Sequence, residues 1–123
     1  MNLLFDTNTI IDFLKLKNPP FDLITLLQDY DCYTSVIVKL ELLRYPDITP
    51  VEENAIIDLL QFFTIIPLTE DIENETILLS RATKLRLPDA IIGATAILYN
   101  AEIVTQDTHF LQCNYDKLKI FSL

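Results

Sequence analysis

The chain has 123 residues, of which 50% are hydrophobic, so it is long enough to form one compact domain with a buried core. Its 9 Lys and Arg residues are outnumbered by 18 Asp and Glu residues, which gives a formal net charge of −9 and a pI of about 4.3. Such a charge repels nucleic acid at long range, so any nucleic-acid function must depend on a local basic patch, bound cations or a basic partner.

Short apolar segments alternate with longer segments of helical periodicity, a pattern that predicts an α/β fold with a mainly parallel sheet. Strands are expected at residues 2–5, 31–34, 62–66, 102–105 and 118–122. Helices are expected at residues 9–16, 21–29, 36–45, 50–61, 70–85 and 88–99. We therefore expect a single domain over residues 1–123, with three layers in which helices cover both faces of a central sheet of four to five strands.

Nothing in the sequence indicates export or a membrane span. The N-terminal residues MNLLFD lack the basic segment of a signal peptide, and no uncharged apolar run approaches the roughly 20 residues that a span needs. Cys32 and Cys113 lie far apart without a zinc-binding pattern, so we expect free thiols. The single glycine, Gly93, excludes glycine-rich phosphate loops. These features predict a cytoplasmic protein.

Two acidic residues follow predicted strands. Asp6 ends the stretch LLFD, and Asp107 comes two residues after Thr105. In open parallel sheets, ligands bind beyond the carboxyl ends of the strands, so acids in these places are candidates for a functional site. Each also has a purely structural explanation, since Asp6 can cap the next helix and Asp107 can lie in a turn.

Two further acids lie on apolar helices. Glu41 falls among apolar residues of its helix, so its carboxylate is expected to be partly buried, unless it forms a surface ion pair with Arg44. Asp89 begins a charge-free helix, where the helix dipole favours an acid. Gly93, one turn along the same face, is expected to leave open space beside Asp89 or to allow another backbone to approach.

Considered together, the four acids predict a metal site, because two follow parallel strands and two lie on helices that can face the same sheet edge. Converging carboxylates without Cys or His favour Mg²⁺ or Mn²⁺, and bound cations relieve the repulsion between the acids. Such a site supports phosphoryl transfer, since divalent cations lower the pKa of an attacking water and stabilise the leaving oxygen.

The chain resembles the PIN-domain family of metal-dependent ribonucleases, especially the short VapC-type toxins. The resemblance rests on three stretches in this order and spacing: LLFDTNTIIDFL, TSVIVKLELL and LPDAIIGATAILYNAEIVTQDTHF. It implies a parallel sheet between helices, a homodimer, cleavage of RNA as the activity, and a protein antitoxin as the partner.

The resemblance also assigns roles to individual residues. It implies that the metal-holding and catalytic acids are Asp6, Glu41, Asp89 and Asp107. It implies that Asn8 and Thr105 orient the acids or water. At His109 many relatives carry a further acid, so this chain departs from the family pattern there, and we expect His109 to be a surface or turn residue.

The nearest basic group is Arg81, Lys84 and Arg86, which precede Asp89 in the sequence. Their side chains are candidates for contacts with substrate phosphates, or they form an ordinary solvated face. For dimerisation, the apolar residues at 40–43 and 56–60 are candidates for an interface.

Three other classes of protein share parts of this pattern. A haloacid-dehalogenase-like phosphatase needs the motif DxDxT, but Asn8 stands where its second acid belongs. A phosphoacceptor receiver domain needs an acid at the end of the middle strand, and residues 62–66 are followed by Pro67. A catalytically silent PIN-like binding domain is the third alternative.

Overall fold

A sheet of four parallel strands forms the centre of the computed structural model, which describes residues 1–19 and 21–122. The strands are β1 (Asn2–Phe5), β2 (Asp31–Ser35), β3 (Thr64–Ile66) and β4 (Ala101–Val104). Their order across the sheet is β3-β2-β1-β4. Phe5 at the end of β1 pairs in register with Thr34 and with Val104, so the carboxyl ends of three strands meet at one edge.

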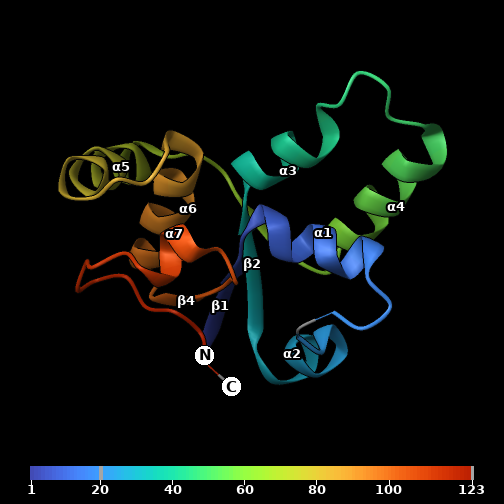
Figure 1. The fold of residues 1–123 in the computed structure, drawn as a ribbon, viewed down its shortest axis with the longest axis horizontal. Helices are drawn as coiled ribbons and strands as arrows, with labels where there is room; N and C mark the ends of the chain where they lie inside the picture. The colour runs from blue at the N-terminus through green and yellow to red at the C-terminus, as the bar shows by residue number, and fades with distance from the viewer. Residues whose placement is uncertain (20, 123) are drawn as a thin grey trace.

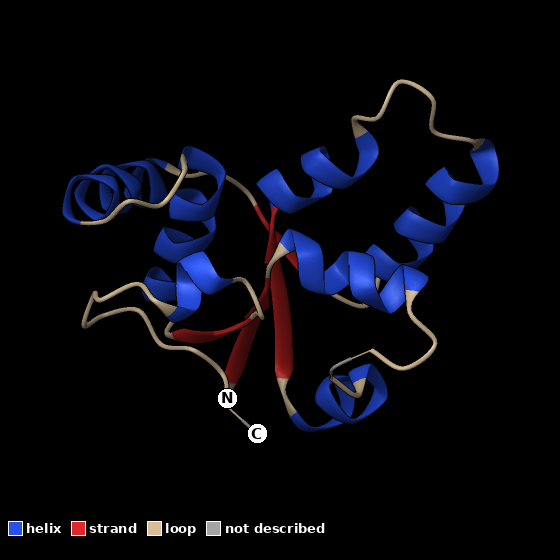
Figure 2. Cartoon of the chain, viewed as in Figure 1, coloured by secondary structure: helices blue, strands red, loops and turns tan. Residues whose placement is uncertain are grey.

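Helices cover both faces of this sheet (Figures 1 and 2). On one side lie α1 (Thr7–Lys15), α2 (Leu23–Asp29), α3 (Val36–Leu43) and α4 (Pro50–Leu60). On the other side lie α5 (Glu70–Ala82), α6 (Leu87–Leu98) and α7 (Thr108–Leu111). The predicted three-layer α/β/α fold with a parallel sheet is therefore confirmed.

The strand order creates a crevice at the edge of the sheet where the strands end. From β1 the chain moves to β2 and β3 on one side, and it then returns to place β4 on the opposite side of β1. The helices that leave β1 and follow β4 consequently lie on opposite faces of the sheet. Such a reversal of strand order is where open α/β sheets bind their ligands.

The core is built from the strands and from α6. Leu3, Leu4 and Phe5 are fully buried, and the Phe5 ring contacts the ring of Phe63 at a centroid distance of 4.9 Å. Each such side chain contributes about 1.5–3 kcal/mol by leaving water. The central turns of α6 are buried throughout, which explains why this segment carries no charge after Asp89. Cys32 and Cys113 are free thiols, as expected.

Space beside Gly93 is occupied, and the prediction of open space or close backbone approach is wrong. A Cβ at this position would lie 2.8 Å from Leu79 Cδ2 and 3.4 Å from Leu118 Cδ1. The neighbours are thus buried side chains. A larger residue at position 93 would force Leu79 to shift, because α5 packs tightly against α6 at this level.

Several predicted element boundaries differ from the structure. Phe62 and Phe63 precede β3 in a turn, and Phe63 is buried because its side chain packs on Phe5 rather than because it belongs to a strand. The strand expected at 118–122 is reduced to one parallel bridge between Ile103 and Ile120. The strand expected at 102–105 begins and ends one residue earlier, so Thr105 lies just beyond it.

The end of α5 and the presence of α7 also differ from expectation. The helix predicted to continue to residue 85 ends at Ala82, because the Thr83 hydroxyl donates to the Leu79 carbonyl and accepts from the Leu85 N–H. The short helix α7 was not predicted. In contrast, the predicted capping box at Thr49 and Glu52 is confirmed by two reciprocal hydrogen bonds of 3.1 Å. No helix in the described part of the chain is long and apolar enough to cross a membrane.

Candidate active site

A cavity of about 120 Å³, here called the carboxylate pocket, opens at the crevice beyond the carboxyl ends of β1 and β4. It is bounded by α1, α3, the start of α6 and the loop after β4. All four predicted acids line it. The full set of lining residues is Asp6, Thr7, Asn8, Ile11, Glu41, Arg44, Tyr45, Arg86, Asp89 and Asp107.

Asp6 is held from two directions. It is the N-cap of α1, where its Oδ1 accepts the Thr9 N–H at 2.9 Å, and its Oδ2 accepts the hydroxyl of Thr105. The residue is only 3% exposed. Burial raises the pKa of Asp6 above its ordinary value of 3.8, hydrogen bonds from Thr105 and Thr9 oppose this shift, and the charge of Asp107 adds to it. The capping role and the placement of a carboxylate in the pocket therefore coexist.

Thr105 links the ends of the two strands that flank the crevice. While its hydroxyl donates to Asp6, the same oxygen accepts the backbone N–H of Asp107 at 2.9 Å. Asp107 in turn caps α7, since its Oδ1 accepts the His109 N–H at 2.8 Å and lies 2.9 Å from the His109 ring nitrogen Nδ1. His109 is exposed, as predicted, but its ring rests against one of the site acids.

Glu41 projects from α3 toward α1. Its Oε1 accepts the Thr7 hydroxyl at 2.7 Å, and the residue is half-buried. Across residues 1–19 and 21–122, no ion pair joins Glu41 to Arg44, so the alternative of a surface ion pair is wrong. The link between Thr7 and Glu41 instead directs the carboxylate into the pocket.

Asp89 is the acid with the least support from its surroundings. It is 8% exposed, and its Oδ2 has no hydrogen-bond partner, although this oxygen forms an ion pair with the Arg86 guanidinium at 3.6 Å. Burial raises the pKa of Asp89 and the Arg86 guanidinium opposes the shift, while three negative charges raise it further, those of Asp107, Glu41 and Asp6. A buried carboxylate oxygen without a hydrogen-bond partner, among other acids, is a position that a cation would stabilise.

The donor set fits a hard divalent cation in kind. Carboxylate oxygens are the ligands that Mg²⁺ and Mn²⁺ prefer, and no sulfur or imidazole lines the carboxylate pocket. Yet no group of three or more acidic, His or Cys side chains in the described ranges is already arranged to hold an ion. Binding would therefore require the four carboxylates to move closer together.

Only some of the residues predicted to assist the acids lie at the carboxylate pocket. Asn8 and Arg86 line the carboxylate pocket, although no hydrogen bond joins Asn8 to Asp6 in the portion of the chain described. Lys84 lines a neighbouring cavity, and Arg81 on the last turn of α5 lines neither. Thr105 lies under the pocket and bridges two acids.

No role was predicted from the sequence for Thr7 or Thr9, and Arg44 was considered only as an ion-pair partner of Glu41. Thr7 supports Glu41, Thr9 supports Asp6, and Arg44 lines the wall. Only Thr9 had a recognisable signal, since it stands three residues after an N-cap acid. The contact of Thr7 with Glu41 joins residues 34 positions apart and has no local signature.

Comparison with known proteins agrees with this geometry. The sequence matches the PIN domain family over residues 3–114. A toxin-antitoxin complex from Klebsiella pneumoniae contains a chain with 31% sequence identity and a TM-score of 0.72, over 86% of this chain and 87% of that one. No curated protein sequence matches the chain.

Two further structures share the fold at lower identity. VapBC2 from Rickettsia felis, bound to a DNA fragment from the promoter, gives a TM-score of 0.84 at 17% identity and covers 98% of both chains. VapBC-1 from nontypeable Haemophilus influenzae gives a TM-score of 0.78 at 18% identity, over 98% of this chain and 97% of that one. The chain therefore belongs to the PIN-domain family and has the fold of the VapC-type proteins of toxin-antitoxin complexes.

Proposed function

We propose that this chain is a Mg²⁺- or Mn²⁺-dependent endoribonuclease that hydrolyses RNA phosphodiester bonds and acts as the toxin of a toxin-antitoxin pair in the cytoplasm. Residues 1–123 form a single nuclease domain in this proposal. The observation that carries it is the buried Oδ2 of Asp89, which has no hydrogen bond and only a long ion pair with the exposed Arg86, in a pocket lined by three other acids. Membership of the PIN family supports a nuclease over the phosphatase alternative.

In this proposal the metal ligands and catalytic acids are Asp6, Glu41, Asp89 and Asp107. The bound cations lower the pKa of water and neutralise charge on the phosphate. Hydrogen bonds from Thr9 and Thr105 fix both oxygens of Asp6, and Thr7 fixes the carboxylate of Glu41. These contacts keep the carboxylates of Asp6 and Glu41 directed toward the pocket, from which they would move closer to a bound cation.

Two guanidinium groups bind the substrate phosphate in this proposal. Arg44 and Arg86 both line the carboxylate pocket and are exposed, so each can reach a phosphate held there. A guanidinium donates two parallel hydrogen bonds to phosphate oxygens, a geometry that Lys lacks. They also supply the local positive charge that an acidic protein needs to approach RNA.

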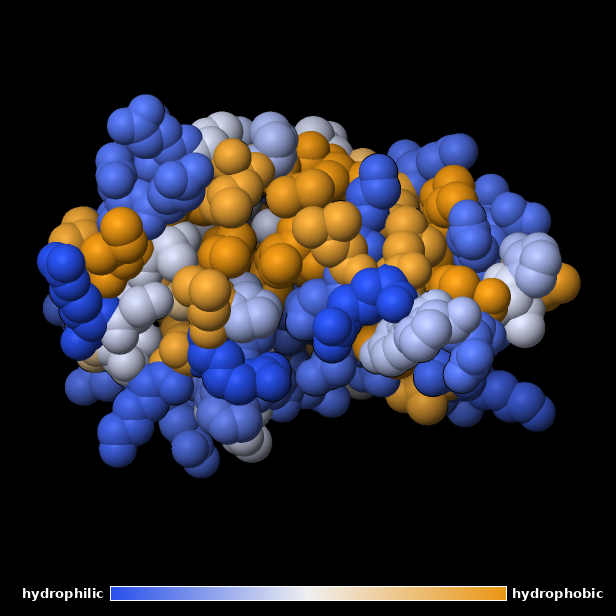
Figure 3. Space-filling view, turned by 90° about the horizontal axis from the view of Figure 1, so that it is seen from above, coloured by the Kyte–Doolittle hydropathy of each residue, from blue (hydrophilic) through white to orange (hydrophobic). Residues whose placement is uncertain are grey.

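A protein antitoxin is the proposed partner, since the solved structures with this fold are toxin-antitoxin complexes. We also propose a homodimer. Large apolar side chains on three helices are exposed, namely Leu40, Ile77, Leu78 and Leu87, and Figure 3 shows apolar surface across the middle of the upper face. Within the segments 40–43 and 56–60, Leu42, Ile56 and Leu60 are buried inside the chain, which leaves Leu40 and Ile57 as the exposed candidates.

The test is cleavage of RNA by the purified chain with Mn²⁺, with EDTA, and with the variant Asp6→Asn. Asn keeps the N-cap acceptor but removes the charge, so the variant is expected to fold and lose cleavage. Asp58→Asn on α4 is a matched control because Asp58 is exposed and lies outside the pocket. Cleavage that survives both EDTA and Asp6→Asn would refute the metal mechanism. A folded wild type that never cleaves RNA would favour the silent binding domain.

A further inference from the structure

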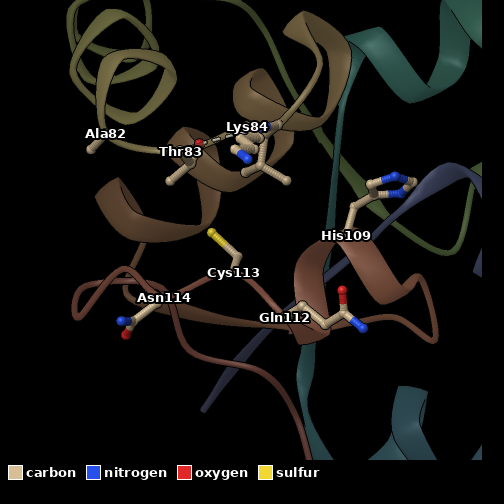
Figure 4. A pocket seen from close by; sticks show the side chains of 8 residues that line it. Ala82, Thr83, Lys84, His109, Gln112, Cys113 and Asn114 are labelled. Carbon is tan, nitrogen blue, oxygen red and sulfur yellow. Dashed lines mark hydrogen bonds between the residues drawn. The ribbon is translucent and has the colours of Figure 1, made fainter.

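A second cavity, here called the side pocket, adjoins the carboxylate pocket and has a volume of about 330 Å³. It lies between the segment that follows α5 and the segment formed by α7 and the residues after it. Figure 4 shows the two segments facing each other, with the Cys113 thiol directed toward Ala82 and Thr83. The lining residues are Ala82, Thr83, Lys84, Leu85, His109, Gln112, Cys113 and Asn114.

The two pockets have no lining residue in common, but their linings are adjacent at two points. Leu85 of the side pocket precedes Arg86 of the carboxylate pocket in the chain, and His109 of the side pocket contacts Asp107 of the carboxylate pocket at 2.9 Å. A ligand chain whose phosphate lies among the acids can therefore extend past His109 into the side pocket.

The side pocket differs from the rest of this acidic protein in its chemistry. It contains no carboxylate, and its charged group is Lys84, while the chain as a whole carries a formal charge of −9. Leu85 is buried and Cys113 partly buried, so the floor is largely apolar. An anionic ligand with a flat apolar part suits this combination of groups.

Two side-chain amides provide donors and acceptors in the side pocket. Gln112 and Asn114 are exposed, and no hydrogen bond occupies either side-chain amide within residues 1–19 and 21–122. The Thr83 hydroxyl, in contrast, is already engaged by the Leu79 carbonyl and the Leu85 N–H. Free amides match the paired donors and acceptors on the edge of a nucleobase.

We infer that the side pocket binds one nucleobase of the RNA, adjacent to the phosphate that is held at the carboxylate pocket. The identity of the ligand as RNA rests on the proposed function. Gln112, which lies on the same side of the side pocket as His109 in Figure 4, contacts the base edge, the base lies over Leu85 and Cys113, and the His109 ring stacks at the end nearest the acids. Asn114 lies on the opposite side of Cys113 and its amide points away from Gln112. Lys84 neutralises the adjoining phosphate. A basic peptide is a poorer fit, because it would meet Lys84 and no acid.

The first test measures binding without catalysis. Backbone amide NMR spectra of the full chain are recorded in EDTA during titration with each of the four nucleoside 5′-monophosphates. We expect shifts concentrated at residues 83–85 and 109–114, and we expect Gln112→Ala to weaken them. The matched controls Gln28→Ala and Asn74→Ala, exposed amides outside the pocket, should leave the shifts intact. Shifts that are absent, that lie elsewhere, or that only a basic peptide produces would overturn the inference.

The second test measures sequence preference on a pool of randomised RNA with Mn²⁺. Gln112→Ala loses the hydrogen bonds to the base edge, so its preference for one base at one RNA position beside the cut should fall by about tenfold. Its preferences at the other RNA positions should be unchanged. A uniform loss of cleavage at all sequences in Gln112→Ala would overturn the base-reading role of Gln112. A wild type that cleaves no RNA would refute the proposed function, and the nucleotide titration would still decide whether the side pocket binds a base.

Discussion

Replacing Thr105 by Val tests whether the hydroxyl between Asp6 and Asp107 organises the site. The two side chains have nearly the same shape, so the change removes hydrogen bonds without leaving a large cavity. Thr105 is 3% exposed, and water cannot easily replace the lost partner. The variant loses a bond to the carboxylate of Asp6 and leaves the N–H of Asp107 without an acceptor.

The expected cost follows from the nature of these two bonds. A bond to a charged group contributes about 1.5–3 kcal/mol and a neutral one about 1 kcal/mol, so the free energy of unfolding should fall by about 3 kcal/mol. For a domain of this size that loss lowers Tm by roughly 10 °C. The pKa of Asp6 should rise further, because the Thr105 hydrogen bond lowers it. If the chain is a metal-dependent nuclease, its metal affinity or cleavage should fall roughly 10- to 100-fold.

Thr95→Val is the matched control. Thr95 is equally buried, but its hydroxyl bonds only to the Ile91 carbonyl one turn earlier in α6, at 2.7 Å. That carbonyl keeps its helical hydrogen bond when the hydroxyl is removed, so the change should be nearly neutral. Urea and thermal unfolding of both variants decide the matter. If Thr105→Val is as stable as Thr95→Val, the proposed importance of the bridge is wrong.

Three further predictions concern charge, ligation and packing. The raised pKa of Asp89 means that burial disfavours its ionised form. The contribution of this group to stability is therefore full below pH 3.8 and is lost as the pH rises through the raised pKa. Asp89→Asn should raise Tm at pH 7 in EDTA and have no effect near pH 3, whereas the exposed control Asp58→Asn should not raise Tm at pH 7. With Mn²⁺ at about 100 times its Kd, the free energy of unfolding of the wild type should rise by about 2.7 kcal/mol. Glu41→Gln should show a smaller rise in thermal unfolding, and an equal rise would exclude Glu41 as a ligand. Gly93→Ala should lower the free energy of unfolding by about 1 kcal/mol in urea titrations. The added methyl group overpacks against Leu79 at a cost of about 1–3 kcal/mol, which exceeds the gain in helix propensity of about 1 kcal/mol. A stabilised variant would contradict the tight packing of α5 on α6.

The convergence of the acids was predictable because it depends on topology. Strands that run parallel bring their carboxyl ends to one edge, which predicts that Asp6 and Asp107 lie at the same edge; the pairing of β1 with β4, which the sequence did not predict, places them beside each other. The apolar surroundings of Glu41 and Asp89 marked them as unusual acids. The placement of all four on one pocket required no knowledge of side-chain conformations.

Features that depend on side-chain contacts were not predictable in this way. Phe63 is of a residue type that favours strands, yet it is buried because its ring contacts the ring of Phe5 across the fold. The end of α5 is set by the hydroxyl of Thr83 rather than by a Gly or Pro, so no familiar stop signal precedes residue 85. The bond between Thr7 and Glu41 depends on how α1 and α3 pack.

The double use of Asp6 and Asp107 has a consequence for observing the site. Each of these two carboxylates faces the pocket and also accepts a backbone N–H, Asp6 from Thr9 at the start of α1 and Asp107 from His109 at the start of α7. A cation that draws these oxygens inward must lengthen or shorten those bonds. The amide hydrogens of Thr9 and His109 are therefore natural reporters of occupancy, whose exchange with deuterium should change on metal binding even in a variant that cannot turn over.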